Sequence, residues 1–198
     1  MKKIINNSLS KSITYQEYRE LVANLLAEGK TTSKDNNDDL INYSKLNHSR
    51  MKRLDKTVKI PTEVIEKIEK INKPVHWLVI TEGWCGDAAQ NLPIINKLAE
   101  LNENISLRIV LRDEHPELMD KFLTNGSKSI PKLIHTEDNH EIIEHWGPRP
   151  SEATKMVEDF KAKHGKLTPE FKKDLQIWYN QDKGMTTIKD MLDFLRLS

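Results

Sequence analysis

The sequence predicts an α/β fold with helical additions at both ends. Two mostly apolar runs rich in β-branched residues, 75–80 and 105–111, are typical of buried strands. Stretches with apolar residues at helical spacing lie before, between and after these runs. We therefore expect a central sheet with helices on both of its sides.

The composition excludes several classes of protein. The chain has 198 residues, of which 37% are hydrophobic and 31% charged, as in a folded globular domain. The net charge of +1 gives no electrostatic reason to expect nucleic acid or an anionic membrane as a partner. No apolar run approaches the ~20 residues of a membrane helix. With one cysteine and no signal-peptide pattern near the start, we expect a cytoplasmic protein.

The first 57 residues predict a helical extension. Residues 1–12 are polar, and we expect them to be frayed. Thr14 and Glu17 have the spacing of a capping box, which predicts a helix that begins there. A second helix is expected over residues 39–56.

The second of these helices ends in a basic stretch that allows two interpretations. Arg50 and Arg53 can be solvated cations that stabilise a helix C-terminus. Alternatively, the two arginines lie beside a thiol pocket and hold an anionic group or lower the pKa of the thiol.

Cys85, the only cysteine, lies at the centre of the pattern. The predicted strand 75–80 is followed by a break at Gly83 and then by a helical pattern, so Cys85 falls at a helix N-terminus. Free N–H groups and the helix dipole there stabilise a thiolate and lower its pKa, which makes the sulfur a nucleophile. The alternative is a small buried hydrophobic residue, which is common for a free cysteine.

The second half of the chain predicts a hairpin and more helices. Residues 132–135 and 141–146 have strand character with a turn between them, so we expect an antiparallel pair. The loop 112–116 follows the strand 105–111 and could reach the pocket, because ligands bind at the carboxyl ends of strands in open α/β sheets. Helices are expected from residue 150 or 151 to about 163 and twice within 164–198.

Four landmarks, in order and at matching spacing, resemble the thioredoxin family. They are the sequence W-C-G-D-A (Trp84, Cys85, Gly86, Asp87 and Ala88), then Pro93, then Ser129–Ile130–Pro131, and finally Gly147. They resemble, respectively, the W-C-G-P-C active-site motif, the helix-kinking proline, the cis-proline loop and the glycine that closes the last strand. The resemblance covers residues 58–163, leaves 1–57 and 164–198 as helical extensions, and implies a mixed sheet. The stretch 46–53 also resembles a bacterial thioredoxin-like group without a well-defined activity.

The departures from that family concern its dithiol chemistry. Ala88 stands where the resemblance requires a resolving cysteine, Val79 replaces the buried aspartate, and Asp87 replaces the proline between the cysteines. The first hypothesis is therefore a monothiol redox protein, in which Cys85 attacks a disulfide of a protein or small molecule. Cys85 accepts one thiol half as a mixed disulfide, the other half leaves as a free thiol, and an outside thiol resolves the mixed disulfide. We expect the pKa of Cys85 to lie below ~8.5 if Asp87 points to solvent.

The second hypothesis is a binding module without redox turnover. By the resemblance, Ile130 and Pro131 line a substrate groove beside Trp84 and Cys85, with the peptide bond before the proline in cis. An open sulfur of low pKa favours the redox hypothesis, whereas a buried neutral thiol favours binding.

Metal and cofactor chemistry is not expected. His135, His140 and His145 cluster in sequence across the predicted hairpin, but the odd spacing of His140 and His145 sends their side chains to opposite faces unless a bulge intervenes. No C-x-x-C or H-E-x-x-H sequence occurs. A cysteine hydrolase would need a histidine within hydrogen-bond reach of Cys85, and the sequence alone does not place one there.

Overall fold

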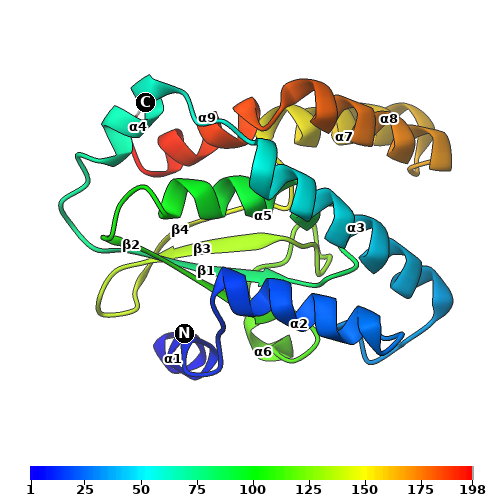
Figure 1. The fold of residues 1–198 in the computed structure, drawn as a ribbon, viewed down its shortest axis with the longest axis horizontal. Coiled ribbons are helices and arrows are strands. Elements are labelled where there is room, and N and C mark those ends of the chain that lie inside the picture. The colour runs from blue at the N-terminus through cyan, green and yellow to red at the C-terminus, as the bar shows by residue number, and fades with distance from the viewer. Residues whose placement is uncertain (198) are drawn as a thin grey trace.

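The computed structural model describes residues 1–197 and confirms the α/β fold (Figure 1). Its sheet has the strand order β2-β1-β3-β4. The strands are β1 (Val75–Thr81), β2 (Ile105–Leu111), β3 (Lys132–Thr136) and β4 (Ile142–Trp146). β1 is parallel to β2 and antiparallel to β3, and β3 is antiparallel to β4, so the sheet is mixed.

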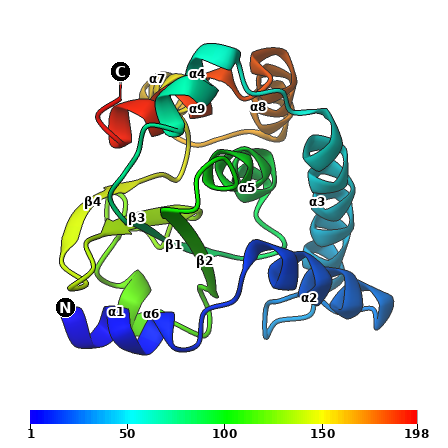
Figure 2. The same ribbon diagram turned by 60° about the vertical axis from the view of Figure 1, so that its left-hand side comes forward.

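Helices surround this sheet. They are α1 (Lys2–Leu9), α2 (Tyr15–Ala27), α3 (Asp38–Thr57), α4 (Thr62–Ile68), α5 (Gly86–Ala99), α6 (Pro116–Met119), α7 (Ser151–His164), α8 (Pro169–Asp182) and α9 (Met185–Phe194). Figure 2 shows α4, α5 and α9 on one side of the sheet and α1 and α6 on the other, with α2 and α3 beyond the β2 edge. None of the helices within residues 1–197 has the length and apolar character needed to cross a membrane.

The N-terminal residues correct one expectation. Residues 1–12 are not frayed: they contain α1, whose Ile5 is fully buried and whose Ser8 is buried beside His115. Ile4 and Leu9 of the same helix also pack against the core, and the burial of these apolar side chains offsets the low helix propensity of the segment. The next helix begins as expected, since Thr14 and Glu17 form both hydrogen bonds of the capping box.

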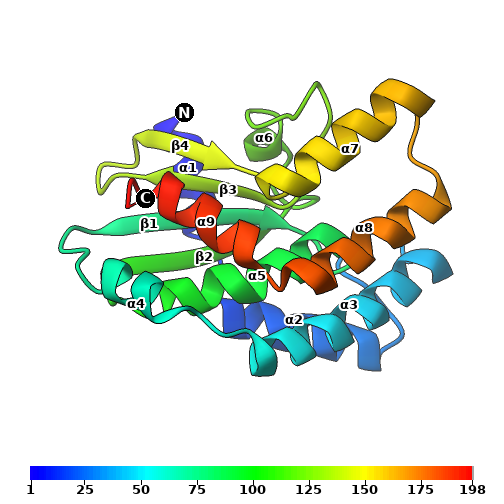
Figure 3. The same ribbon diagram turned by 90° about the horizontal axis from the view of Figure 1, so that it is seen from above.

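The buried residues fall into two clusters. The main core combines the sheet with α5 and α9 and also takes in Ile5, Tyr18 and Met51 from the N-terminal helices. A separate small cluster lies between α7 and α8, built from Ala153, Val157, Phe171, Leu175 and Tyr179. Figure 3 shows α7 and α8 extending away from the sheet on the side of α5. These two helices therefore share a small apolar cluster of their own, and the start of α7 is tied to α9, where the backbone N–H and the hydroxyl of Ser151 donate to Asp190 at 2.8 and 2.7 Å.

Candidate functional site around Cys85

Cys85 is the N-cap residue of α5, at the junction that the sequence predicts. Its Sγ accepts the backbone N–H of Ala88 at 3.4 Å, and its S–H donates to the carbonyl oxygen of Ile130 at 3.2 Å. The residue is only 7% exposed. The sulfur thus lies between the first turn of α5 and the loop before β3, where it is shielded from water.

The expectation of a low thiol pKa is wrong for this structure. Burial raises the pKa of Cys85 to about 12, and the nearby Asp87 carboxyl adds to the rise. The N–H groups of Ala88 and Asp87 and the charge of Arg149 act in the opposite direction but are outweighed. Desolvation of a charged sulfur costs more than one helix terminus recovers. Cys85 is therefore a neutral thiol at pH 7.

Asp87 does not point to solvent, so the condition under which a low pKa of Cys85 is expected is not met. Its side chain is 12% exposed and forms an ion pair with Arg149 at 2.8 Å. The hydroxyl of Tyr179 donates to its other carboxylate oxygen at 2.9 Å. Burial raises the pKa of Asp87, while Arg149 and Tyr179 oppose that rise. The carboxyl is thus a largely buried, bonded group close to the sulfur.

Polar side chains of α5 connect this site to the C-terminal helices. Asn91 donates to the hydroxyl of Tyr179 at 3.3 Å and accepts from Thr187 of α9 at 2.6 Å. Gln90 donates to Gln176 of α8 at 3.0 Å. Gln90 and Asn91 are both buried, so these partners satisfy groups that would otherwise be costly to remove from water.

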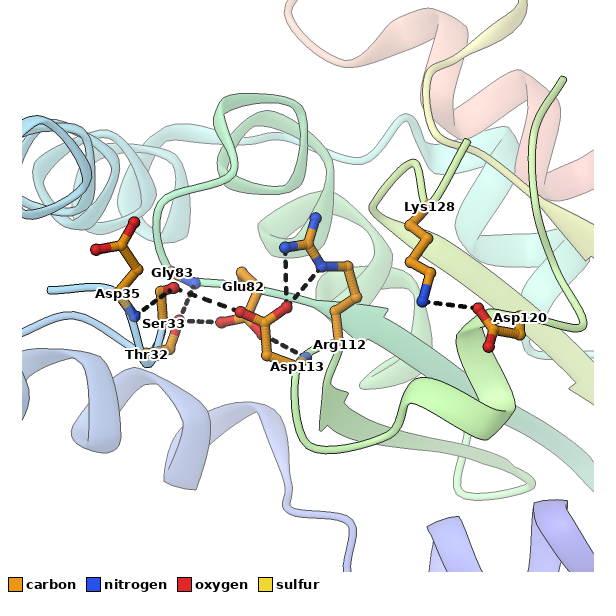
Figure 4. Close-up of polar contacts among 9 residues, drawn as sticks. All are labelled: Thr32, Ser33, Asp35, Glu82, Gly83, Arg112, Asp113, Asp120 and Lys128. Carbon is orange, nitrogen blue, oxygen red and sulfur yellow. Dashed lines mark hydrogen bonds and ion pairs between the residues drawn. The ribbon is translucent and has the colours of Figure 1, made fainter. Parts of the chain in front are cut away.

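A second polar network surrounds Glu82, two residues before Trp84 in the sequence. Figure 4 shows Glu82 between Thr32, from the loop after α2, and Asp113, from the loop after β2. Glu82 is fully buried and accepts from the Thr32 hydroxyl and from the backbone N–H of Asp113, the latter at 3.0 Å. Burial raises the pKa of Glu82, while these two donors oppose the rise. The network fixes the backbone immediately before Cys85, because Thr32 also accepts the N–H of Gly83 at 3.0 Å.

Arg112 lies over the ring of Trp84. Its guanidinium carbon lies 4.7 Å from the centroid of the indole ring, a cation–π distance. Asp113 holds the guanidinium by an ion pair of 2.8 Å, drawn in Figure 4. The loop 112–116 thus reaches the site, as the sequence analysis allowed. The indole Nε1 of Trp84 is buried and has no hydrogen-bond partner within residues 1–197.

The loop before β3 brings the other expected residues to Cys85. The Ile130–Pro131 peptide bond is cis, as is the Gly147–Pro148 bond. Both Ile130 and Pro131 are buried, so this loop exposes little of these two side chains beside Cys85. Gly147 is needed where it stands: its φ is +107°, and a Cβ there would collide with the carbonyl oxygen of Pro131.

The two arginines of α3 have different surroundings. Arg50 lies beside the motif, since a Cβ placed on Gly86 would be 3.9 Å from its Nη1. It donates to Asn47 at 2.7 Å, and no carboxylate within residues 1–197 forms an ion pair with it. Arg53 instead donates to Asn180 of α8 at 2.8 Å, on an exposed surface. Of the two arginines of α3, only Arg50 is therefore placed to meet a ligand at Cys85.

Sequence reasoning missed Arg149, Tyr179 and Glu82. One signal was present: Gln90 and Asn91 are adjacent polar residues in a helix that otherwise reads as buried, and buried amides need partners. That pattern predicts a polar neighbour but does not name it. Within residues 1–197, no group of three or more His, Cys, Asp and Glu side chains is arranged to hold a metal ion.

Comparison with known proteins agrees with this geometry. A family model described as Thioredoxin matches residues 33–161. No curated protein matches the chain. A crystal structure of a protein of unknown function, PA1234 from Pseudomonas aeruginosa, superimposes with a TM-score of 0.59 at 16% identity over 93% of this chain and 98% of that one. A crystallised HIV epitope-scaffold gives the same score and identity over 94% and 99%. The family match spans well over half of the sequence, and the chain belongs to the thioredoxin family.

Proposed function

We propose that this thioredoxin-family protein is a binding module, in which Cys85 rests as a redox-silent thiol and the surface around Trp84 and the cis-proline loop receives an extended acidic peptide. The observation that carries the proposal is the state of Cys85. Its sulfur is 7% exposed and its S–H donates to Ile130. A disulfide substrate must approach a thiolate in line with its S–S bond, and neither the charge nor the access is present.

The missing resolving group supports the same proposal. Ala88, in the position of a second cysteine, is 1% exposed and packs in the main core. A mixed disulfide formed at Cys85 would therefore persist until an outside thiol reached a buried sulfur. Turnover under these conditions is slow, whereas binding needs neither step.

Arginines define the chemistry of the expected ligand. Arg50, Arg112 and Arg149 all lie near the W-C-G-D-A motif, and Arg112 and Arg149 already have carboxylate partners. Burial lowers the pKa of Arg50, because a guanidinium cation is less stable away from water. A carboxylate from a ligand would restore a favourable charge pair. An acidic side chain in the bound peptide is thus the element that Arg50 would select.

Peptide selection tests this function. A random dodecapeptide library displayed on phage is selected on the immobilised full-length protein, on Arg50→Gln and on Cys85→Ser. We expect enrichment of peptides containing Asp or Glu, retained by Cys85→Ser and lost by Arg50→Gln. Lys52→Gln is the matched control, because it removes the same charge from an exposed position on the same helix. Enrichment that requires Cys85 and is released by a reductant would overturn the binding proposal.

One observation favours monothiol redox chemistry as the second candidate. Cys85 caps α5, and the Ala88 N–H already points at its sulfur. If the site opened to water, the desolvation that raises the pKa would fall away and the helix terminus would stabilise the thiolate. The redox candidate therefore requires an open form of the site. It predicts that a small disulfide added in excess leaves one half bound to Cys85 as a mixed disulfide and releases the other half as a thiol.

A further inference from the structure

Helices α7 and α8, residues 151–182, form an arm that meets the rest of the molecule near Cys85. From α8, Tyr179 donates to Asp87, Gln176 accepts from Gln90, and Asn180 accepts from Arg53. The amide nitrogen of Gln176 also lies close to Gly86, since a Cβ there would be 3.8 Å away. The arm therefore covers the first turn of the helix that Cys85 caps.

Hydrogen bonds, rather than a shared apolar core, make up these contacts of α8. The apolar side chains of the arm are buried in the small cluster between α7 and α8 and not in the main core. A cavity of about 520 Å³ lies between the end of α3 and α8, and Tyr179 and Asn180 line it. An attachment of this kind separates more readily than a packed core, because water can replace each hydrogen bond.

The junction of α8 with α9 provides a fixed end for the arm. Lys183 and Gly184 both have positive φ, +54° and +85°. A Cβ on Gly184 would collide with Ile94 of α5, so the backbone lies directly against that helix. α9 itself is anchored in the main core by Ile188 and Met191. Movement of α8 can thus pivot at this junction while α9 stays in place.

We propose that α8 is a latch over Cys85, closed by the hydrogen bond from Tyr179 to Asp87, and that its release exposes the thiol and makes it reactive. The inference rests on the proposed function, because it explains how the resting thiol is kept silent. With α8 displaced, water reaches Asp87 and the sulfur, and the thiol can lose its proton to solvent. The same chain then has a silent form and a nucleophilic form.

The test measures the rate of Cys85 alkylation by iodoacetamide in the folded, full-length protein. In this reaction the thiol proton passes to solvent, the sulfur forms a bond to carbon, and iodide leaves. Tyr179→Phe removes only the hydroxyl, so the ring still packs in the small cluster. Tyr15→Phe is the matched control: it removes a buried tyrosine hydroxyl that donates to Asp55 at 2.6 Å, on the α2–α3 side of the molecule.

We expect Tyr179→Phe to raise the alkylation rate about tenfold over wild type, because a hydrogen bond to a charged group commonly changes an equilibrium by at least that factor. Tyr15→Phe should leave the rate within about twofold of wild type. Thermal unfolding of both variants shows whether the change is local. Slow alkylation that is equal in all three proteins would overturn the latch and leave the binding module standing. Fast alkylation of the wild type would instead overturn the silent thiol on which the binding module rests.

Discussion

The main core and the arm of this molecule are held by different forces. In the main core, strand β1 and helix α5 are buried among apolar side chains, with Val79, Leu92 and Leu98 fully inaccessible. The contacts of α8 with the first turn of α5 are hydrogen bonds and lie beside a cavity. The comparison indicates that the core fixes the position of Cys85, whereas the Asp87 network and, in the latch that we propose, the arm control the reactivity of its sulfur.

The largest expected effect is on the free energy of unfolding, and it distinguishes the main core from the arm. Leu98→Ala leaves a cavity in the main core and should lower the free energy of unfolding by ~3 kcal/mol, measured by urea denaturation. Leu175→Ala deletes the same atoms from the small cluster. We expect Leu175→Ala to raise the alkylation rate of Cys85 under native conditions, while Leu98→Ala changes it only near the unfolding transition. Equal native alkylation in the two variants would remove the distinction between the regions.

Asp87→Asn tests the residue through which the main core and the arm are in contact, because Asp87 accepts from Tyr179. The change removes the charge-assisted bond to Arg149, whose side chain is 22% exposed, so the free energy of unfolding should fall by ~2 kcal/mol. It also removes the charge that helps to raise the pKa of Cys85, so that pKa should fall. Denaturation and alkylation against pH measure the two effects. Asp138→Asn is the control, since its side chain is 74% exposed, and we expect a loss below ~1 kcal/mol.

Alkaline pH should destabilise the protein through Cys85. The pKa of Cys85 is raised to about 12 in the folded protein, whereas in the unfolded chain the thiol ionises near ~8.5. Between these values the unfolded state releases the proton first, so stability is full below the lower value and falls as pH rises. The slope is at most ~1.4 kcal/mol per pH unit. Cys85→Ala should lack this contribution; parallel stability curves for the two proteins between pH 9 and 10 would contradict the raised pKa.

The smallest expected effect comes from Thr14, which belongs neither to the arm nor to the surroundings of Cys85. Thr14→Ala removes the capping box of α2 and should cost ~1 kcal/mol of stability. Cys85 alkylation should stay at the wild-type rate, because α2 makes no contact with the arm in the hydrogen bonds described. A large rise in alkylation would show that the thiol responds to any loss of stability rather than to its own surroundings.

Local sequence signals were sufficient for most of the fold. The apolar run 105–111 predicts β2 with its observed bounds, and the Thr14–Glu17 pair predicts the start of α2. The sequence predicts Cys85 at a helix N-cap because an apolar strand pattern breaks at Gly83 and helical spacing follows, and the structure has it there. These features depend on residues that are neighbours in the sequence.

The chemical state of the site could not be predicted in the same way. The bonding of Asp87 depends on Arg149 and Tyr179, which lie 62 and 92 residues beyond it, and the thiol of Cys85 donates to Ile130, 45 residues beyond the cysteine. Helical spacing marks Tyr179 as a packing residue, which it is, but gives no indication that its hydroxyl reaches another helix. A thiol pKa depends on such distant contacts as much as on the helix terminus.

Alkylation of wild-type Cys85 as a function of pH tests the central claim most directly. If the thiol is buried and neutral, iodoacetamide should react at least tenfold more slowly than with an unstructured cysteine peptide, and the midpoint should lie well above ~8.5. A midpoint at or below ~8.5, with a rate equal to that of the peptide, would show an open thiolate. That result would contradict the resting state described for Cys85 and favour the monothiol redox candidate.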